Sequence, residues 1–213
     1  MKKSHLLGAL CATVFSLCVA VPAEAFLMTR LDGAAAYDTV LDITWTTDAS
    51  LSGLNNWYDL VAWADSLEYL GFDDWRLASL EVSAGLPVGR TSGLHSNCRY
   101  ATELACRDNE LGYMFYHNLG GSYKDNLSGD RTIGDVTLTN IQNGYWSSTE
   151  IDDNGAWGFW FNLGVQDFIP YFKVNDRYGW AVRDGDVVPE PPMVLLLATG
   201  LIGLIGLARI RAA

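Results

Sequence analysis

Between residues 145 and 161 the chain reads Tyr145-Trp146-Ser147-Ser148-Thr149-Glu150-Ile151-Asp152-Asp153-Asn154-Gly155-Ala156-Trp157-Gly158-Phe159-Trp160-Phe161. Aromatic residues, which favour strands, are frequent in the runs 145–149 and 156–161. The polar centre closes with Asn154-Gly155, a pair that adopts the positive backbone angles of a hairpin turn. The sequence therefore predicts two antiparallel strands joined by a short turn.

Helices are expected earlier in the chain. Apolar residues recur at helical spacing from about Trp57 to Leu70, with Asn55 or Asn56 as the cap and Gly71 as the stop. Two shorter helices are also predicted: one beginning at Ser79 with Glu81 in its first turn, and one from Asn109 or Glu110 to Leu119 that Gly120-Gly121 ends.

Further short strands are predicted at 41–45, 74–77 and 179–183, and loops at 87–100 and 121–134. Helices followed by a small antiparallel sheet indicate an α+β domain. Arg76 and Arg183 lie in two of these strands, and we expect each to pair with a buried carboxylate rather than with a ligand.

The N-terminus has the pattern of a secretory signal peptide. Two lysines open the chain, an apolar run from Leu6 to Val21 follows, and Ala23-Glu24-Ala25 supplies the small-x-small pattern of a cleavage site. We expect a signal peptide at 1–25, cleaved between Ala25 and Phe26. The alternative is a signal anchor that stays uncut, and in either case the chain is exported.

A second apolar run lies near the C-terminus. Met193 to Ala208 carries no charge, follows Pro189-Glu190-Pro191, and precedes Arg209 and Arg211. Sixteen residues make a helix of about 24 Å, shorter than a hydrocarbon core of about 30 Å. We expect a transmembrane helix at 193–208 that tethers the protein to the inner membrane transiently, with the arginines on the cytoplasmic side. The alternatives are a plain C-terminal anchor and a buried core helix.

The segment between these ends is acidic. Four of the 14 basic residues and two of the 25 acidic ones lie in the terminal segments, so residues 26–188 carry 10 basic and 23 acidic groups, a net charge of −13. Such a domain repels nucleic acid and other polyanions, so no nucleic-acid partner is expected. The same segment keeps two cysteines, Cys98 and Cys106, which we expect to form a disulfide in an oxidising compartment. Free or metal-bound thiols are the alternative.

Three aromatic residues are candidates for glycan binding: Trp160, Tyr171 and Phe172. Sugars present apolar CH faces as well as hydroxyl groups, so a sugar site needs an exposed ring beside polar groups. Alternation along the strand points Trp160 away from the face of Phe159 and Phe161, while Tyr171 and Phe172 lie in a loop. The alternative is that these rings fill the core.

A cluster of oxygen-bearing side chains is a candidate calcium site, consisting of Glu150, Asp152, Asp153 and Asn154. The alternative is that they serve the hairpin turn, where Asp and Asn are favoured for their local hydrogen bonds. No other cofactor is expected. No nucleophile motif accompanies His95 or His117, so we do not expect an enzyme.

Several motifs lie along the central segment: Tyr37-Asp38 with 41–45, Asp74-Trp75-Arg76-Leu77, Glu110-Leu111-Gly112 with Tyr116, 145–150, Ala156-Trp157 and Trp180-Ala181-Val182-Arg183. Together these motifs resemble the Lcl C-terminal domain family. The resemblance covers most of residues 37–187 and implies a C-type-lectin-like fold for a domain at 26–187. Family members bind sulfated glycans, a ligand class that a net charge of −13 disfavours here. Formylglycine-generating oxidases share this fold, but their cysteine pair has no counterpart in residues 120–186.

The C-terminal segment 188–213 resembles a PEP-CTERM sorting signal, in which Pro189-Glu190-Pro191 precedes a hydrophobic span and a basic tail. This resemblance implies an exosortase as partner, which cuts near the motif and releases the domain to the cell surface or the extracellular space. We therefore expect an exported protein that binds or organises exopolysaccharide. The alternative is a structural matrix protein without a small-ligand site.

Overall fold

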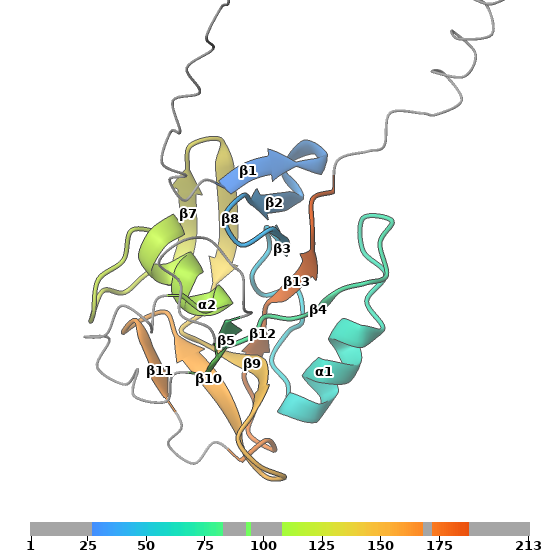
Figure 1. Cartoon of the computed structure of the whole chain (residues 1–213), viewed down its shortest axis with the longest axis vertical. Helices are drawn as coiled ribbons and strands as arrows, with labels where there is room; N and C mark the ends of the chain where they lie inside the picture. The colour runs from blue at the N-terminus through green and yellow to red at the C-terminus, as the bar shows by residue number, and fades with distance from the viewer. Residues whose placement is uncertain (1–26, 83–92, 95–107, 168–171, 188–213) are drawn as a thin grey trace, which may run out of the picture.

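The computed structural model describes residues 27–82, 93–94, 108–167 and 172–187 (Figure 1). These residues form an α+β core of mostly antiparallel strands with two short helices. Within these ranges, no helix is both long enough and apolar enough to cross a membrane. Several predictions concern other parts of the chain: the signal peptide and its cleavage at Ala25 and Phe26, the Cys98–Cys106 disulfide, Tyr171, the sorting motif and the span 193–208.

The first sheet has five strands and brings the two ends of the described core together. In spatial order they are β1 (Leu27–Arg30), β2 (Ala35–Asp38), β3 (Ile43–Thr46), β13 (Ala181–Asp184) and β4 (Arg76–Leu77). All neighbouring pairs are antiparallel. Arg30, the last residue of β1, donates two hydrogen bonds to Asp186, at 2.7 and 2.8 Å. The first and last described segments therefore lie side by side.

The second sheet contains the aromatic hairpin. Its order is β11 (Val165–Asp167), β10 (Ala156–Trp160), β9 (Gly144–Glu150) and β12 (Tyr178–Gly179), with β12 parallel to β9. The antiparallel pairing of β9 with β10 confirms the predicted hairpin. Two small hairpins complete the strands: β5 (Glu81–Val82) with β6 (Gly93–Leu94), and β7 (Gly129–Ile133) with β8 (Val136–Ile141).

The helices confirm two predicted starting points. α1 (Trp57–Asp65) begins after Asn56, whose side chain accepts a hydrogen bond from the N–H of Asp59. α2 (Glu110–Tyr113) begins after Asn109, which caps Gly112 in the same way, and a π-helical turn continues it over Met114–Asn118. Asx side chains at these positions satisfy N–H groups that have no partner within the helix.

Several predictions of secondary structure were wrong. The expected strand 179–183 is divided at Trp180 between β12 and β13, and the expected loop 87–100 contains β6. The first helix stops at Asp65 rather than Leu70, because Ser66 leaves the helical backbone conformation and the N–H of Leu67 bonds to Ala64, three residues back. No helix begins at Ser79, since its hydroxyl accepts a hydrogen bond from the N–H of Glu81, which starts the strand β5. The expected loop 121–134 contains the strand β7.

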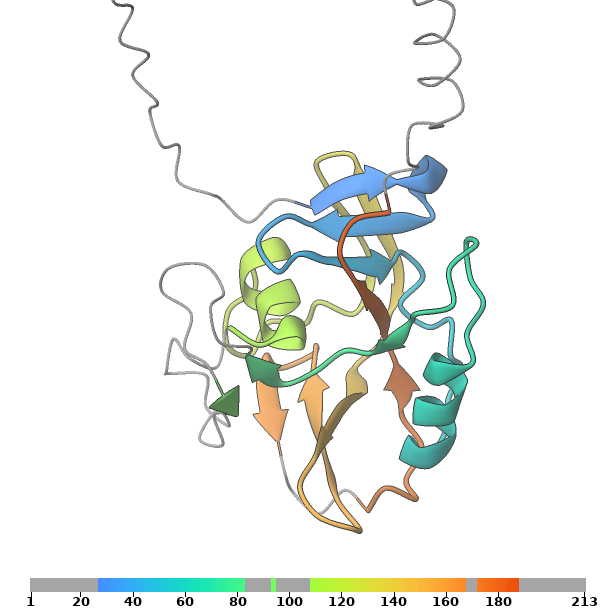
Figure 2. The same ribbon diagram turned by 45° about the vertical axis from the view of Figure 1, so that its right-hand side comes forward.

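Trp180 lies between β12 and β13 and joins the two sheets. Figure 2 shows these two strands one after the other in the middle of the core. The side chain is fully buried, and its indole N–H donates to the carbonyl of Thr46 in β3 at 2.9 Å. Its ring centroid lies 5.1 Å from that of Trp45 and 5.4 Å from that of Tyr145, which belong to the first and second sheet respectively. The main core therefore forms around this ring, between the sheets and α2.

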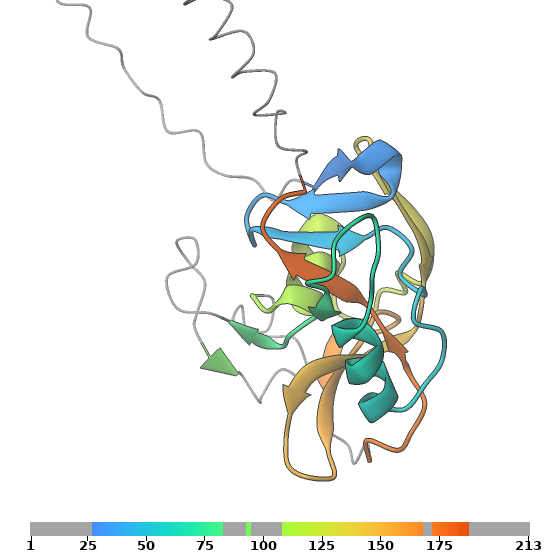
Figure 3. The same cartoon turned by 90° about the vertical axis from the view of Figure 1, so that its right-hand side faces the viewer.

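The second sheet is covered on both faces. Tyr145, Phe159 and Phe161 face the main core, whereas Trp146 packs against a smaller cluster with the buried side of α1. Figures 1 and 3 show α1 lying alongside this sheet. The side chains that α1 buries there are Trp57, Leu60 and Ala64.

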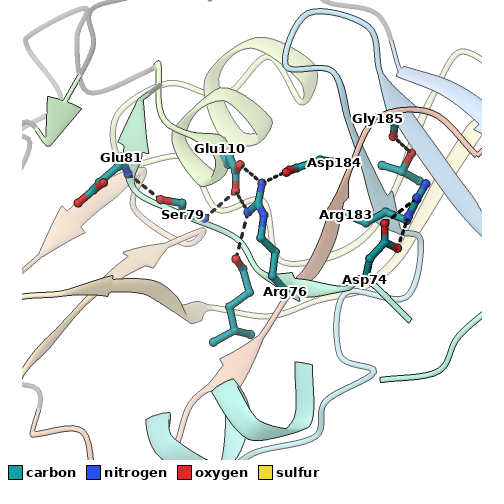
Figure 4. A network of polar contacts seen from close by, with 10 residues as sticks. Asp74, Arg76, Ser79, Glu81, Glu110, Arg183, Asp184 and Gly185 are labelled. Carbon is teal, nitrogen blue, oxygen red and sulfur yellow. Dashed lines mark hydrogen bonds and ion pairs between the residues drawn. The ribbon is translucent and has the colours of Figure 1, made fainter. Parts of the chain in front are cut away.

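Two arginines hold the strands of the first sheet to their surroundings (Figure 4). Arg76 donates to both carboxylate oxygens of Glu110, at 2.7 and 2.9 Å, and to Asp184 at 2.6 Å. Glu110 also accepts the N–H of Ser79, so it links the start of α2 to β4. Arg183 donates twice to Asp74, and this hydrogen bonding lowers the pKa of Asp74. The prediction of a buried carboxylate partner is confirmed for Arg76, which pairs with Glu110, and is wrong for Arg183, whose partner Asp74 is exposed.

We expect a coupling free energy of about 1–3 kcal/mol between Arg76→Met and Glu110→Gln in a double-mutant cycle. The physical reason is that the side chain of Glu110 is only 12% exposed. Either variant alone therefore leaves the charge of the other residue poorly neutralised. Arg183→Met with Asp74→Asn is the matched control. The side chain of Asp74 is 54% exposed, and its coupling should stay below about 1 kcal/mol. Denaturant unfolding measures both cycles, and equal couplings would contradict this role of burial.

Candidate functional site

The candidate site is an open pocket of about 200 Å³ beside the second sheet. It is formed where four separate parts of the chain meet: the residues before α1, the connection from β8 to β9, the end of β10, and the segment that enters β12. Its lining consists of Leu54, Gln142, Asn143, Gly144, Trp160, Asp176, Arg177 and Tyr178.

Trp160 supplies the aromatic wall of the pocket. Its neighbours Phe159 and Phe161 are buried in the main core, and the alternation along β10 turns the half-buried indole to the other face. Trp160 pairs with Gly144 across the hairpin. A Cβ atom at Gly144 would lie 2.7 and 2.8 Å from two carbons of the indole, so the ring rests directly on the glycine backbone. The absence of a side chain at Gly144 therefore sets the position of Trp160.

Arg177 forms a second wall, with its guanidinium carbon 5.1 Å from the centroid of the Trp160 ring. Its backbone is fixed by two hydrogen bonds with Asn55, one in each direction, at 2.9 and 2.8 Å. Its side chain also donates to the carbonyl of Asp176 at 2.7 Å. The arginine and the exposed carboxylate of Asp176 are therefore presented together at the pocket.

The floor of the pocket is tied to the sheet by hydrogen bonds. The N–H of Gln142 donates to the hydroxyl of Tyr145 at 2.6 Å, and the side-chain amide of Gln142 donates to the carbonyl of Asn140. Tyr145 is buried, and burial raises its pKa, so the hydroxyl stays protonated. Asn143 beside it is exposed. The lining thus combines one large ring with amide, carboxylate and guanidinium groups, an arrangement suited to reversible binding of a polar ligand.

Of the four candidate calcium ligands, Glu150 and Asp152 have side chains engaged in other contacts, while Asp153 and Asn154 accept hydrogen bonds through their backbone carbonyls. Asp152 accepts the N–H groups of Asn154 and Gly155, both at 2.8 Å, as an Asp in a tight turn does. Glu150 accepts a hydrogen bond from the ammonium group of Lys173, and the carbonyl of Asp153 accepts another from the hydroxyl of Tyr58. Among the described residues, no group of three or more His, Cys, Asp or Glu side chains is placed to hold a metal ion.

Lys173 ties this turn to two other parts of the chain. The residue is 2% exposed, and its ammonium nitrogen lies 4.4 Å from the ring centroid of Trp57 and 5.5 Å from that of Tyr58. Its backbone N–H donates to Asn154, and its carbonyl accepts the N–H of Trp57. One side chain therefore joins the start of α1, the β9–β10 turn and the segment 172–178.

Of the three glycan-binding candidates, Trp160 lines the pocket. Phe172 is 57% exposed and pairs with Gly155, outside the pocket lining, and Tyr171 lies outside the described residues. Sequence reasoning did not identify the polar residues of the lining, namely Gln142, Asn143, Asp176 and Arg177. The short polar runs before β9 and β12 were the only local signal for them, and such runs are common in loops.

Comparison with known proteins finds no match for this chain, either to a model of a protein family or to a curated protein.

We expect replacement of Glu150 to destabilise the protein more than replacement of Lys173, its partner in the ion pair. Glu150→Gln leaves an ammonium buried beside a neutral amide and should lower the free energy of unfolding by about 1–3 kcal/mol. Lys173→Met removes the buried charge itself, and the 55% exposed Glu150 side chain returns to water, so the loss should stay below about 1 kcal/mol. Denaturant unfolding measures both, and the reverse order would contradict this account. A calcium-induced rise in Tm that Glu150→Gln abolishes would instead support a calcium site at the turn.

Proposed function

We infer that this protein is an exported glycan-binding protein whose site is the Trp160 pocket. One observation carries the proposal: a half-buried indole, held on Gly144, borders an open pocket that also presents donors and acceptors from Asn143, Asp176 and Arg177. This combination is what the recognition of a sugar requires, since the CH face of the sugar packs on a ring while its hydroxyl groups bond to polar side chains.

The charge of the protein favours a neutral glycan. Residues 26–188 have a net charge of −13, which repels a polyanion over several ångströms of solution. Within the pocket, Asp176 and Arg177 are neighbours, so their charges largely compensate each other. Together they can accept and donate hydrogen bonds to hydroxyl groups without a net charge of their own. A neutral exopolysaccharide is therefore the ligand class that we propose.

A C-type-lectin-like fold of the Lcl C-terminal domain type is proposed as the finer description of the core. Two observations support it. The core is a mixed α+β structure whose first and last described strands share one sheet. The aromatic residues of the resembling motifs, among them Trp146 and Trp180, are buried at the centres of the two packed clusters. Binding rather than catalysis is the activity proposed for this domain.

Export and sorting complete the proposal. The signal peptide would direct the chain across the inner membrane, and an exosortase would process the Pro189-Glu190-Pro191 segment and transfer the domain to the cell surface or the extracellular matrix. The position of Asp186 next to Arg30 supports this arrangement, because the chain leaves the core beside β1. Figures 1 to 3 place the second sheet at the end of the core away from β1, so the pocket beside this sheet would lie at a distance from a tether.

Trp160→Ala should weaken binding to the extracellular polysaccharide of the producing strain by about thirtyfold, because a stacked aromatic anchor contributes about 2 kcal/mol. Trp63→Ala is the matched control, since Trp63 is also a partly buried tryptophan but lies on α1 outside the pocket lining. Affinity measurements on the full-length protein purified in detergent compare the variants with the wild type.

A second variant tests the site independently, in case Trp160→Ala does not fold. Gly144→Ala retains the tryptophan but forces the half-buried indole to move, so it should weaken binding while the unfolding transition changes little. Equal binding by the wild type, Trp160→Ala and Gly144→Ala would refute the proposed site. Absence of binding by all of them would leave a structural matrix protein as the function.

Replacement of Pro189, Glu190 and Pro191 by alanine removes the motif that we propose the exosortase recognises. The variant should therefore stay in the membrane fraction with its C-terminal segment uncut. Pro192→Ala, one residue further along, is the control and should be processed like the wild type. Intact-mass spectrometry of surface and membrane fractions measures the outcome. Loss of the C-terminal segment from the triple variant as well would contradict exosortase recognition of this motif.

A further inference from the structure

A second exposed surface adjoins the Trp160 pocket. Seven large apolar side chains are exposed within the described residues, and five of them lie on three segments that bond to one another. The five are Leu54, Tyr58, Ile151, Phe172 and Val174, with exposed fractions of 57%, 49%, 42%, 57% and 71%. Leu54 also lines the pocket, so this surface and the pocket share a residue.

The segment 172–177 connects the exposed apolar surface with the Trp160 pocket. At one end Phe172 pairs with Gly155 in the β9–β10 turn, and at the other Arg177 stands over Trp160. Five residue steps span at most about 18 Å, so one extended ligand could contact both ends. Between them, the indole N–H of Trp146 donates to the carbonyl of Asn175 at 3.0 Å, which holds the segment against the sheet.

The orientation of side chains along this segment is the reverse of what solvation favours. Lys173 is buried, while its neighbours Phe172 and Val174 are exposed. Water would stabilise the opposite arrangement, with the ammonium outside and the apolar groups inside. The contacts of Lys173 with Glu150 and Trp57 hold the segment in this orientation. Exposed apolar groups that are maintained in this way are typical of a binding surface.

Tyr58 faces the same region and is held there. Its hydroxyl donates to the carbonyl of Asp153 at 3.0 Å, and its ring lies 5.5 Å from the ammonium group of Lys173. The carboxylates of Asp152 and Asp153 are exposed nearby on the turn. Rings alternate here with polar groups, which suits a ligand that is itself apolar on its faces and polar at its edges.

We propose that Tyr58 and Phe172, which we call the Tyr58–Phe172 platform, bind further units of the polysaccharide chain whose first contact is the Trp160 pocket. The inference rests on the proposed function and makes it more specific: the ligand is the interior of a linear neutral polysaccharide rather than a single sugar or a chain end. Asp152 and Asp153 on the turn add negative charge at the platform end of this path, which disfavours an acidic chain.

The test uses the polysaccharide of the producing strain after partial acid hydrolysis, with fragments separated by length. The wild-type full-length protein in detergent should bind long fragments about tenfold more tightly than short ones, because a chain that fills two subsites makes more contacts. Tyr58→Ala/Phe172→Ala should lose this gain and bind short fragments as the wild type does. Tyr123→Ala is the control, since Tyr123 is 40% exposed on a different segment, and it should retain the gain.

The outcomes separate the two proposals. Binding that depends on Trp160 but does not increase with length, or an increase that survives in Tyr58→Ala/Phe172→Ala, overturns the platform and leaves the pocket. Failure of all fragments to bind overturns both. Sedimentation of the same samples tests a different occupant: a wild-type dimer that this double variant converts to a monomer would assign the platform to a second copy of the chain instead.

Discussion

The packing of Trp180 between β12 and β13 is the constraint on which both sheets depend. Its indole bonds to Thr46 in the first sheet and contacts Tyr145 in the second, so one side chain sets how the sheets lie relative to each other. Tyr145 in turn supports Gln142 at the floor of the pocket. A large, fully buried ring can move little in a close-packed interior. The position of Trp180 therefore helps to fix Tyr145 and, through it, the floor of the pocket.

The pocket and the platform are held by different physical means. Trp160 rests on a glycine in the opposite strand, so local strand pairing sets its position. The segment 172–177 has little regular structure of its own, and the buried ammonium of Lys173 anchors it to α1 and to the β9–β10 turn. Separating the buried ammonium from its carboxylate partner costs free energy, so this contact favours one arrangement of the segment 172–177.

The structure also relates the proposed site to the proposed route of export. Arg30 and Asp186 hold the first and last described segments together beside the first sheet, whereas the pocket belongs to the second. A tether that continues from residue 187 would therefore leave the core near β1. A domain built in this way would keep its glycan-binding surface accessible to polymer outside the cell, before and after removal of a C-terminal segment.

Local patterns in the sequence predicted the β9–β10 hairpin, the starts of α1 and α2 and the outward direction of Trp160, because turn chemistry, capping and side-chain alternation act between near neighbours. The same patterns did not identify the early end of α1 at Asp65 or the strand β7. Only the tertiary structure brought Leu54, Asn143 and Arg177 to Trp160, and buried Lys173 so that Phe172 faces solvent. Leu54, Asn143 and Arg177 are not near neighbours of Trp160 in the chain. Contacts between such residues arise from packing, which produces no periodic pattern in the sequence.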